Sequence, residues 1–292
     1  YVPEKWTLSP EALPFGESMG LIAGQPCQFA LQPIVEPSEG KISSLEALIR
    51  GNDGGSPEHF FSTLDPDKIY EVDLQTKAYA FALAEKLGID IASVRQGMAA
   101  DNRIGSAYLS PGAGFGGENF SHDILTLANT VANTGVKSQL LAQVWDINEQ
   151  QKEILFRKLW NYYHGDLHGK TVAIWGASFK ENTSSIQQSP IHPMLAALWA
   201  QGVTVRLHDP QALDEIEAMY GQRDDLILCK DQYVAVQGVH GLCILTAWKQ
   251  YWSPDFKQLI QLMSHPLILD GRNIYDPHYV KAQGFAYMGV GR

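Results

Sequence analysis

The carboxyl-terminal part of the chain alternates short apolar runs with stretches that place apolar residues at helical spacing. The helical stretches include residues 191–201 and 212–220. The runs of strand length are residues 171–175, 204–208, 226–228, 241–246 and 267–270. Strands that alternate with helices form parallel sheets, because each crossover helix returns the chain to the same edge. We therefore predict a small, doubly wound α/β domain over residues 164–292.

The first 88 residues have a different pattern. Residues 28–35 and 42–50 read as two strands joined by a turn, which predicts a β-hairpin. Residues 70–87 carry apolar positions at helical spacing, and Gly88 follows where a helix C-cap is expected. We predict a small segment over residues 1–88 that consists of a hairpin and a helix.

Residues 89–163 are expected to be mainly helical. A short helix is predicted within residues 89–105, before a glycine-rich loop over residues 108–120. Two further helices are predicted over residues 123–133 and 137–163. The second of these has one broad apolar face and is expected to be the spine of a central domain.

The composition restricts the classes of function. With 292 residues, 45% of them hydrophobic, the chain is long enough for two or three domains. Its formal net charge of -10 provides no basic field, so we expect neither nucleic acid nor a membrane as partner. No apolar run approaches the roughly 18 residues of a membrane span, and the first residues lack the pattern of a secretion signal. A cytoplasmic location is expected.

The cysteines and histidines predict neither a disulfide nor a metal site. Cys27, Cys229 and Cys243 are odd in number and far apart, without CxxC spacing. We expect them to be reduced and mostly buried. The nine histidines show no paired spacing of metal ligands, so we predict no bound metal.

The segment 103–123 is the first candidate for a functional loop. Glycines at 112, 114, 116 and 117 let backbone amides approach an anion or a sugar ring without a Cβ in the way. Arg103 and Tyr108 add a charge and a stacking surface. The same glycines also suit a tight structural turn between helices, and the pattern alone leaves both interpretations open.

Several short motifs follow one another in a fixed order along residues 89–292. Arg103-Ile104-Gly105 precedes Pro-Gly-x-Gly-Phe-Gly-Gly at residues 111–117. Further motifs lie at residues 169–176, 179–183, 189–190, 209–210, 244–246 and 270–277. Together they resemble the UDP-glucose and GDP-mannose dehydrogenase family. The resemblance implies a helical dimerisation centre over residues 89–163, followed by a Rossmann-like, parallel-sheet UDP-binding domain over residues 164–292.

The resemblance also implies a substrate site. Arg103 matches the arginine that reaches across the family's dimer interface to the substrate phosphates. The positions that match the loop holding pyrophosphate and sugar are Tyr108, Gly112, Phe115 and Gly116, and those that match the basic contacts of the UDP-binding domain are Lys180 and Arg272. The implied partners are a UDP-sugar ligand and a second copy of the chain, bound through the central helix.

The sequence departs from the family where its chemistry is carried. Asn119 stands at the position of the family's cysteine nucleophile, and a carboxamide cannot form the thiohemiacetal that the second oxidation needs. Asp123 matches the aspartate that assists a catalytic water, although it suits a helix N-cap or first-turn acid equally well. Ser121 and His122 replace a Pro-Lys pair, and the positions usually held by two aspartates and an arginine are Ser184, Ser185 and Gln187. We predict no catalytic residue in this chain.

The dinucleotide-binding half of the family is not recognisable. Residues 112–117 spell GxGxxG, but they are not predicted to follow a strand in a βαβ unit. We therefore expect no cofactor in this chain, and NAD only if another chain supplies the dinucleotide domain.

A second set of motifs lies in residues 27–88. A Phe-Ala-Leu-Gln-Pro-Ile-Val strand at residues 29–35 precedes Glu46-Ala47-Leu48 and Arg50. This order resembles the start of an EAL phosphodiesterase domain for cyclic dimeric GMP. The resemblance implies that Glu46 is a metal ligand and Arg50 a phosphate contact, but it covers only the first third of that domain. One carboxylate cannot assemble a two-metal site. Whether cyclic dimeric GMP binds is left open, as is the origin of the hybrid by fusion, design or deletion.

Three functional hypotheses follow from these patterns. The leading one is a UDP-sugar-binding pseudoenzyme that has lost both the nucleophile and the NAD domain. The second is a dimeric structural or interaction module. The third is a UDP-sugar dehydrogenase activity that another chain completes. The sequence does not indicate which sugar is bound.

Overall fold

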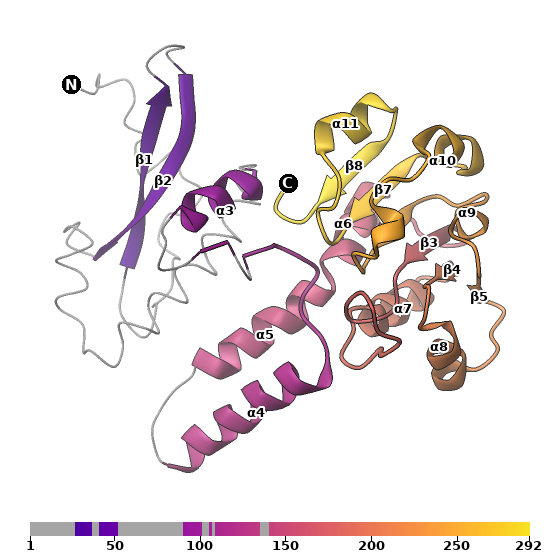
Figure 1. The fold of residues 1–292 in the computed structure, drawn as a ribbon, viewed down its shortest axis with the longest axis horizontal. Coiled ribbons are helices and arrows are strands. Elements are labelled where there is room, and N and C mark those ends of the chain that lie inside the picture. Colours follow the sequence, from indigo (N-terminus) through magenta and orange to yellow (C-terminus); the bar gives the residue numbers. More distant parts are fainter. Residues whose placement is uncertain (1–26, 37–40, 52–89, 101–104, 107–108, 135–139) are drawn as a thin grey trace. The chain divides into compact units, whose positions relative to one another are not determined.

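The computed structural model describes residues 27–36, 41–51, 90–100, 105–106, 109–134 and 140–292 (Figure 1). The chain divides into two compact units, Tyr1–Leu87 and Gly88–Arg292. The helix predicted over residues 70–87 and its cap at Gly88 lie outside the described residues. Arg103 and Tyr108 lie outside them as well.

The first unit contains the predicted β-hairpin. β1 (Cys27–Glu36) and β2 (Lys41–Gly51) pair antiparallel, from Cys27 opposite Gly51 to Glu36 opposite Lys41. The register shifts between Ile34 and Val35, which is the mark of a β-bulge. The hairpin is therefore confirmed, and both strands are slightly longer than the apolar runs that predicted them.

The second unit is built on a six-stranded sheet. Its strands are β3 (Thr171–Trp175), β4 (Thr204–His208), β5 (Leu226–Leu228), β6 (Leu242–Ile244), β7 (Leu267–Asp270) and β8 (Ala286–Gly289). Their order is β5-β4-β3-β6-β7-β8, and every neighbouring pair is parallel. The predicted doubly wound parallel sheet is confirmed. The sequence patterns did not predict β8, and β6 is shorter than the predicted run over residues 241–246.

Both faces of this sheet are buried, which explains why its strands are continuous apolar runs. Along β3, Val172 and Ile174 belong to one core, whereas Ala173 and Trp175 belong to the other. The first core receives α6 (Ile154–Tyr162), α7 (Ile191–Ala200) and α8 (Leu213–Tyr220). The second receives α9 (Gln232–Ala235), α10 (Phe256–Leu262) and α11 (Pro277–Ala282).

The helices of the second core start at aspartate caps. Asp231, Asp255 and Asp276 each accept hydrogen bonds from backbone N–H groups of the first turn of α9, α10 and α11. Asp90 caps α3 (Ile91–Ala99) in the same way, by accepting from the N–H of Ala92. These side chains satisfy donors that have no partner inside the helix. α3 confirms the short helix predicted within residues 89–105.

The central helices differ from the prediction at two points. α4 (Glu118–Asn133) begins before residue 123, because Gly117 at φ +91° turns the chain into the helix and Glu118 provides a first-turn acid. The single helix predicted over residues 137–163 is instead α5 (Leu140–Lys152) followed by α6. Figure 1 shows α4 and α5 as neighbouring helices that extend away from the sheet.

The break between α5 and α6 lies at Glu153. The N–H of Glu153 bonds to the carbonyl of Gln150 at 3.3 Å, three residues back instead of four. Arg157 Nη2 donates to the same carbonyl at 2.7 Å, which stabilises the turn. Beyond this turn, Leu155 and Leu159 of α6 belong to the core under the sheet.

Candidate functional site

The strand order places a crevice at one edge of the sheet. After β3 the chain crosses to β4 on one side, and after β6 it crosses to β7 on the other. Ligands of open α/β sheets bind where the order reverses in this way, outside the carboxyl ends of the strands. Gly176, which follows β3, adopts φ +97°, and a Cβ there would lie 2.6 Å from the backbone nitrogen of Thr246 after β6. The loops that follow these two strands therefore touch at a glycine.

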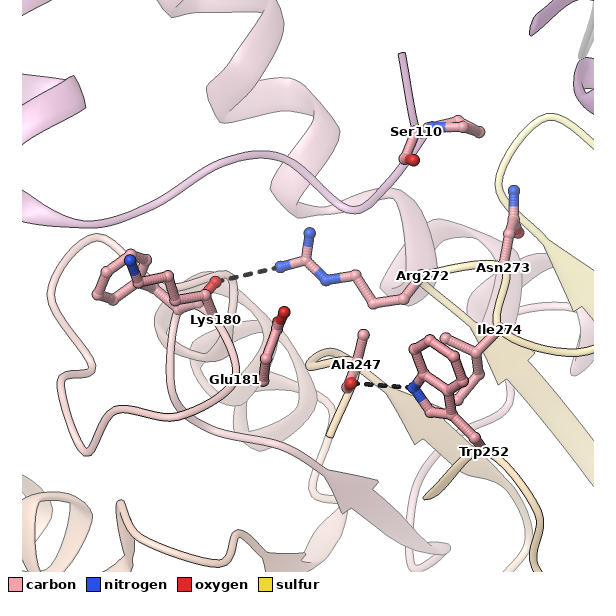
Figure 2. A pocket seen from close by; sticks show the side chains of 10 residues that line it. Ser110, Lys180, Glu181, Ala247, Trp252, Arg272, Asn273 and Ile274 are labelled. Atoms are coloured by element: carbon pink, nitrogen blue, oxygen red, sulfur yellow. Dashed lines mark hydrogen bonds between the residues drawn. The ribbon is translucent and has the colours of Figure 1, made fainter. Parts of the chain in front are cut away.

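A cavity of about 510 Å³ opens at this edge (Figure 2). Its lining comes from the loops after β3, β6 and β7, and from the segment before α4. The lining residues are Ser110, Pro111, Phe179, Lys180, Glu181, Ala247, Trp252, Arg272, Asn273 and Ile274. Small-molecule sites span about 300–1,000 Å³, so the cavity is large enough for a nucleotide-sized ligand.

Arg272 is the half-buried cation of the cavity. Its Nε donates to the carbonyl of Leu245 at 2.6 Å, and its terminal nitrogens donate to the carbonyls of Gly114 and Phe179 at 3.4 Å. Burial lowers the pKa of the guanidinium, while Glu181 and Asp270 oppose that change. An arginine keeps its charge under such conditions, so the cavity contains a fixed cation with a planar set of donors.

Asp270 holds the loop that carries Arg272. This fully buried carboxylate at the end of β7 accepts from the N–H of Arg272 at 3.0 Å, the N–H of Tyr275 at 3.1 Å and the hydroxyl of Tyr287 at 3.0 Å. Burial raises the pKa of Asp270, and the three donors act against that shift. The arginine is therefore positioned by its backbone as well as by its side chain.

Lys180 and Glu181 complete the charged part of the cavity. Both side chains are exposed, and Lys180 Nζ lies 5.4 Å from the ring centroid of Phe179. Figure 2 shows Glu181 beside the guanidinium of Arg272. Two cations and one carboxylate leave an excess positive charge, which suits an anionic group of a ligand.

A second buried carboxylate fixes the loop after β3. Asp209 accepts from the N–H groups of Ala177 at 2.7 Å and Ser178 at 3.0 Å, and from Nε1 of Trp248 at 3.1 Å. Thr246 Oγ1 also donates to the carbonyl of Ser178 at 2.6 Å. These bonds join the loops after β3, β4 and β6, so the cavity wall is formed by residues with few alternative conformations.

The glycine-rich loop is held by α5. Asn148 is buried and pairs with the backbone of Phe115 in both directions, accepting from its N–H at 2.7 Å and donating to its carbonyl at 3.1 Å. Gln151 donates to the carbonyl of Gly112 at 2.9 Å. A Cβ on Gly114 would lie 2.9 Å from the buried Lys152 side chain, so this loop fits α5 only with a glycine at that point.

The same loop also contacts the sheet domain. The N–H of Ala113 bonds to the carbonyl of Gly271, and the N–H of Gly117 bonds to the carbonyl of Gln187. A Cβ on Gly112 would lie 3.1 Å from Nη1 of Arg272. A side chain at this position would therefore press against the cavity cation.

The structure brings together only part of the predicted site. Lys180 and Arg272 line one cavity, and Gly112 lies against Arg272. Phe115 and Gly116 belong to the adjoining loop, where Phe115 packs edge-on against Phe120 at 4.9 Å between ring centroids. Among the described residues, neither of them lines the cavity.

The positions that match the family's catalytic residues lie on α4. Asn119 and Asp123 are both exposed, in the first two turns of the helix, and neither is among the lining residues of the cavity. Asp123 lies 3.7 Å from the exposed ring of His122. Neither side chain is desolvated in this chain.

Sequence reasoning missed several residues that shape the site. Trp252 lines the cavity, and Asn148 with Gln151 holds the glycine-rich loop. Trp252 follows the strand predicted over residues 241–246, but a single tryptophan after a strand does not indicate where its side chain points. Asn148 lies on the helix predicted over residues 137–163, and the pattern that predicts this helix is formed by its apolar residues alone.

Metal-binding clusters and membrane-spanning helices are both absent from the described part of the chain. It contains no cluster of three or more His, Cys, Asp or Glu side chains that could bind a metal ion. Within the same residues, no helix combines the length and the apolar character of a membrane span.

Comparison with known proteins identifies the family of two stretches of the chain. Residues 80–150 match the central domain of the UDP-glucose/GDP-mannose dehydrogenase family, and residues 173–277 match its UDP binding domain. These two stretches belong to that family. The resemblance predicted for residues 89–292 is confirmed to this extent, whereas the EAL resemblance and its residues Glu46 and Arg50 stay predictions.

Curated relatives agree with this assignment. The chain is 40% identical over 208 residues to a UDP-glucose 6-dehydrogenase of Pseudomonas aeruginosa, which covers 70% of this chain and 46% of the relative. It is 32% identical over 210 residues to a UDP-glucose 6-dehydrogenase of Rhizobium meliloti, covering 72% of this chain and 47% of the relative. The chain thus spans about half the length of the curated relatives it matches.

Solved structures show the same fold. A UDP-glucose dehydrogenase of Pyrobaculum islandicum superimposes with a TM-score of 0.62 at 25% identity, over 84% of this chain and 58% of that chain. A UDP-D-ManNAc dehydrogenase of Pyrococcus horikoshii superimposes with a TM-score of 0.61 at 20% identity, over 82% and 53%.

The described residues do not fit a dinucleotide cofactor such as NAD. The glycines of residues 112–117 lead into α4, but the described residues just before them (105–106 and 109–111) form no strand. After β3, the described loop has Gly176 followed by Ala177 and Ser178, without the second glycine that admits a pyrophosphate. No chemical step of this part of the chain is assigned to such a cofactor.

Proposed function

We propose that this chain binds a UDP-sugar through its nucleotide diphosphate in the cavity at the carboxyl edge of the sheet. The observation that carries the proposal is that Arg272 and Lys180 line one cavity at the point where the strand order reverses. Arg272 offers a planar fork of donors, which matches phosphate oxygens, and Lys180 adds a mobile point charge.

The cavity lining joins the two stretches that match the family. Ser110 and Pro111 lie in the central-domain match, and the other lining residues lie within residues 173–277, the match to the UDP binding domain. The relatives named above are UDP-glucose 6-dehydrogenases, which supports a UDP-sugar as the ligand class.

The chain by itself is proposed to be a pseudoenzyme. Asn119 stands at the position of the nucleophilic cysteine, and its carboxamide cannot attack an aldehyde carbon as a thiolate does. Asn119 is also exposed on α4, so no low-dielectric pocket surrounds it in this chain. Oxidation of a bound sugar would then require residues that another chain supplies.

Calorimetric titration of the full chain with UDP and with UDP-glucose tests the binding. Saturable heat with one site per chain is expected, whereas no heat at millimolar ligand ends the proposal. Addition of NAD to the UDP-glucose mixture is expected to give no reduced cofactor. Reduction of NAD by the chain alone would overturn the pseudoenzyme part and favour the dehydrogenase hypothesis.

A second candidate function is a homodimeric interaction module. The observation that favours it is a group of exposed apolar side chains on the paired helices α4 and α5, namely Phe120 (58% exposed), Leu125, Leu127 (52%) and Ile147. Exposed apolar side chains on helices occur in protein interfaces. A module without ligand binding would dimerise but give no calorimetric response to UDP.

A further inference from the structure

The cavity has two chemically different sides. Figure 2 shows Lys180 and Glu181 on one side and Trp252 with Ile274 on the other, with the guanidinium of Arg272 directed into the space between them. One side therefore suits an anion, and the other suits an apolar, flat group. A ligand that fills both must carry these two groups at its two ends.

Trp252 is held in place although much of its ring is uncovered. Its Nε1 donates to the carbonyl of Ala247 at 3.0 Å, and its backbone N–H bonds to the carbonyl of Lys249 at 3.1 Å. The short helix η3 (Lys249–Tyr251) that precedes it is anchored by Tyr251, which is fully buried and stacks on Trp175 at 4.9 Å between ring centroids.

The uncovered part of this ring is large. Trp252 remains 54% exposed, whereas Trp175 and Trp248 of the same domain are buried. An anchored indole with a free surface loses little conformational entropy when a second ring is placed on it. The indole N–H is already paired with Ala247, so the ring offers stacking rather than hydrogen bonding.

We propose that Trp252 determines base recognition by stacking on the nucleobase of a nucleoside diphosphate whose phosphates lie on Arg272 and Lys180. This inference rests on the proposed function of the cavity. The tryptophan contributes the affinity for the nucleoside end, and the two cations contribute the affinity for the phosphate end. Because every nucleobase has a flat π-face, the tryptophan selects for a base without distinguishing strongly among bases.

Calorimetry on the full chain with two probes separates the two ends of the cavity. The probes are UDP, which has a base and a diphosphate, and inorganic pyrophosphate, which lacks the base. The variants are Trp252→Ala, Trp252→Phe and the control Tyr279→Ala, which removes an aromatic ring of similar exposure (56%) that is not among the lining residues.

Removal of the ring is expected to weaken UDP binding by roughly 5- to 150-fold, the range measured for single base–aromatic stacks. Trp252→Phe should retain most of the affinity, because a ring is still present. Pyrophosphate should bind all variants equally, which also shows that Trp252→Ala is folded. Tyr279→Ala should bind both probes like the unchanged chain.

Each other outcome has a defined meaning. Equal UDP affinity for Trp252→Ala and the unchanged chain overturns the role of Trp252 and leaves the proposed function intact. If Trp252→Ala binds UDP and pyrophosphate more weakly to the same extent, the inference is overturned too, because the ring then affects the phosphate end of the cavity. Absence of UDP binding in the unchanged chain contradicts the proposed function itself.

Discussion

Arg272 combines two roles that are usually separate. Its three nitrogens bond to carbonyls of three segments, at Gly114, Leu245 and Phe179, so it connects the glycine-rich loop to the sheet domain. The same guanidinium lines the cavity and retains its charge. A single residue therefore links the position of the loop to the positive charge of the cavity.

Replacement of Arg272 by glutamine should lower UDP affinity by about 10- to 100-fold, the usual effect of losing hydrogen bonds to a charged group. Arg272→Lys should recover part of the affinity, because lysine retains the charge but not the planar fork. Arg223→Gln is the control, since Arg223 pairs with Asp225 before β5, away from the cavity lining. Equal UDP affinity for Arg272→Gln and the control, measured by calorimetry, would contradict the assignment.

A half-buried and a buried histidine should make stability depend on pH. Burial lowers the pKa of His192 and of His208 below the ordinary value of 6.5. His192 is paired through both ring nitrogens, with the hydroxyl of Tyr220 and the carbonyl of Ile186, each at 2.6 Å. Because the unfolded chain binds more protons just below pH 6.5, stability should be greatest above that pH and should decrease as the pH falls.

The variant His192→Gln tests this dependence. Urea unfolding of the full chain above and below pH 6.5 should show a smaller loss of stability on acidification than in the unchanged chain. His278→Gln, which removes an exposed histidine, should leave the loss unchanged. If the unchanged chain and both variants showed the same pH dependence, His192 would titrate alike in the folded and the unfolded state.

At the scale of elements, the close contact between the loops after β3 and β6 depends on Gly176. Gly176→Ala combines an unfavourable φ of +97° with a collision against Thr246. Gly169→Ala imposes a similar φ of +71° in open space and should cost about 1 kcal/mol. The collision should add about 1–3 kcal/mol to the unfolding free energy lost in Gly176→Ala. Equal losses in urea titrations would show that the loops can separate without cost.

The sequence predicts the strands of the sheet better than the helices of the centre. Residues 171–175, 204–208, 226–228 and 267–270 are strands as predicted, because a strand buried on both faces must be a continuous apolar run. The break at Glu153 has no local signal. It depends on Arg157 bonding to Gln150 and on the separate packing of α5 and α6, which are tertiary effects.

Part of the cavity lining is predictable from the motifs. Lys180 and Arg272 were placed in the site by resemblance alone, and both line the cavity. Trp252 and Asn148 could not be predicted, because their roles depend on where a neighbouring loop lies. A position-by-position resemblance indicates which charges are retained, but not which other side chains close the cavity.

At the scale of the whole molecule, the apolar surface of α4 and α5 predicts self-association. Leu127→Glu places a charge on this surface without disturbing a core, since Leu127 is 52% exposed. The proposed dimer should dissociate at least about tenfold more readily. Met219→Glu on α8, at 59% exposure, is the matched control and should retain the mass of the unchanged chain in sedimentation equilibrium. An unchanged mass for Leu127→Glu would assign the dimer contact elsewhere or exclude it.

We propose that this chain retains the nucleotide-binding part of its family's function. The central and UDP-binding stretches are present, and their shared cavity retains two cations, while Asn119 stands at the nucleophile position. We therefore expect this chain to bind the nucleotide without oxidising the sugar.

The most direct test is a crystal structure of the full chain grown with saturating UDP. The account predicts a diphosphate within hydrogen-bonding distance of Arg272 and Lys180, at the carboxyl edge of β3 and β6. An empty cavity, or a UDP molecule ordered at another place on the chain, would contradict it.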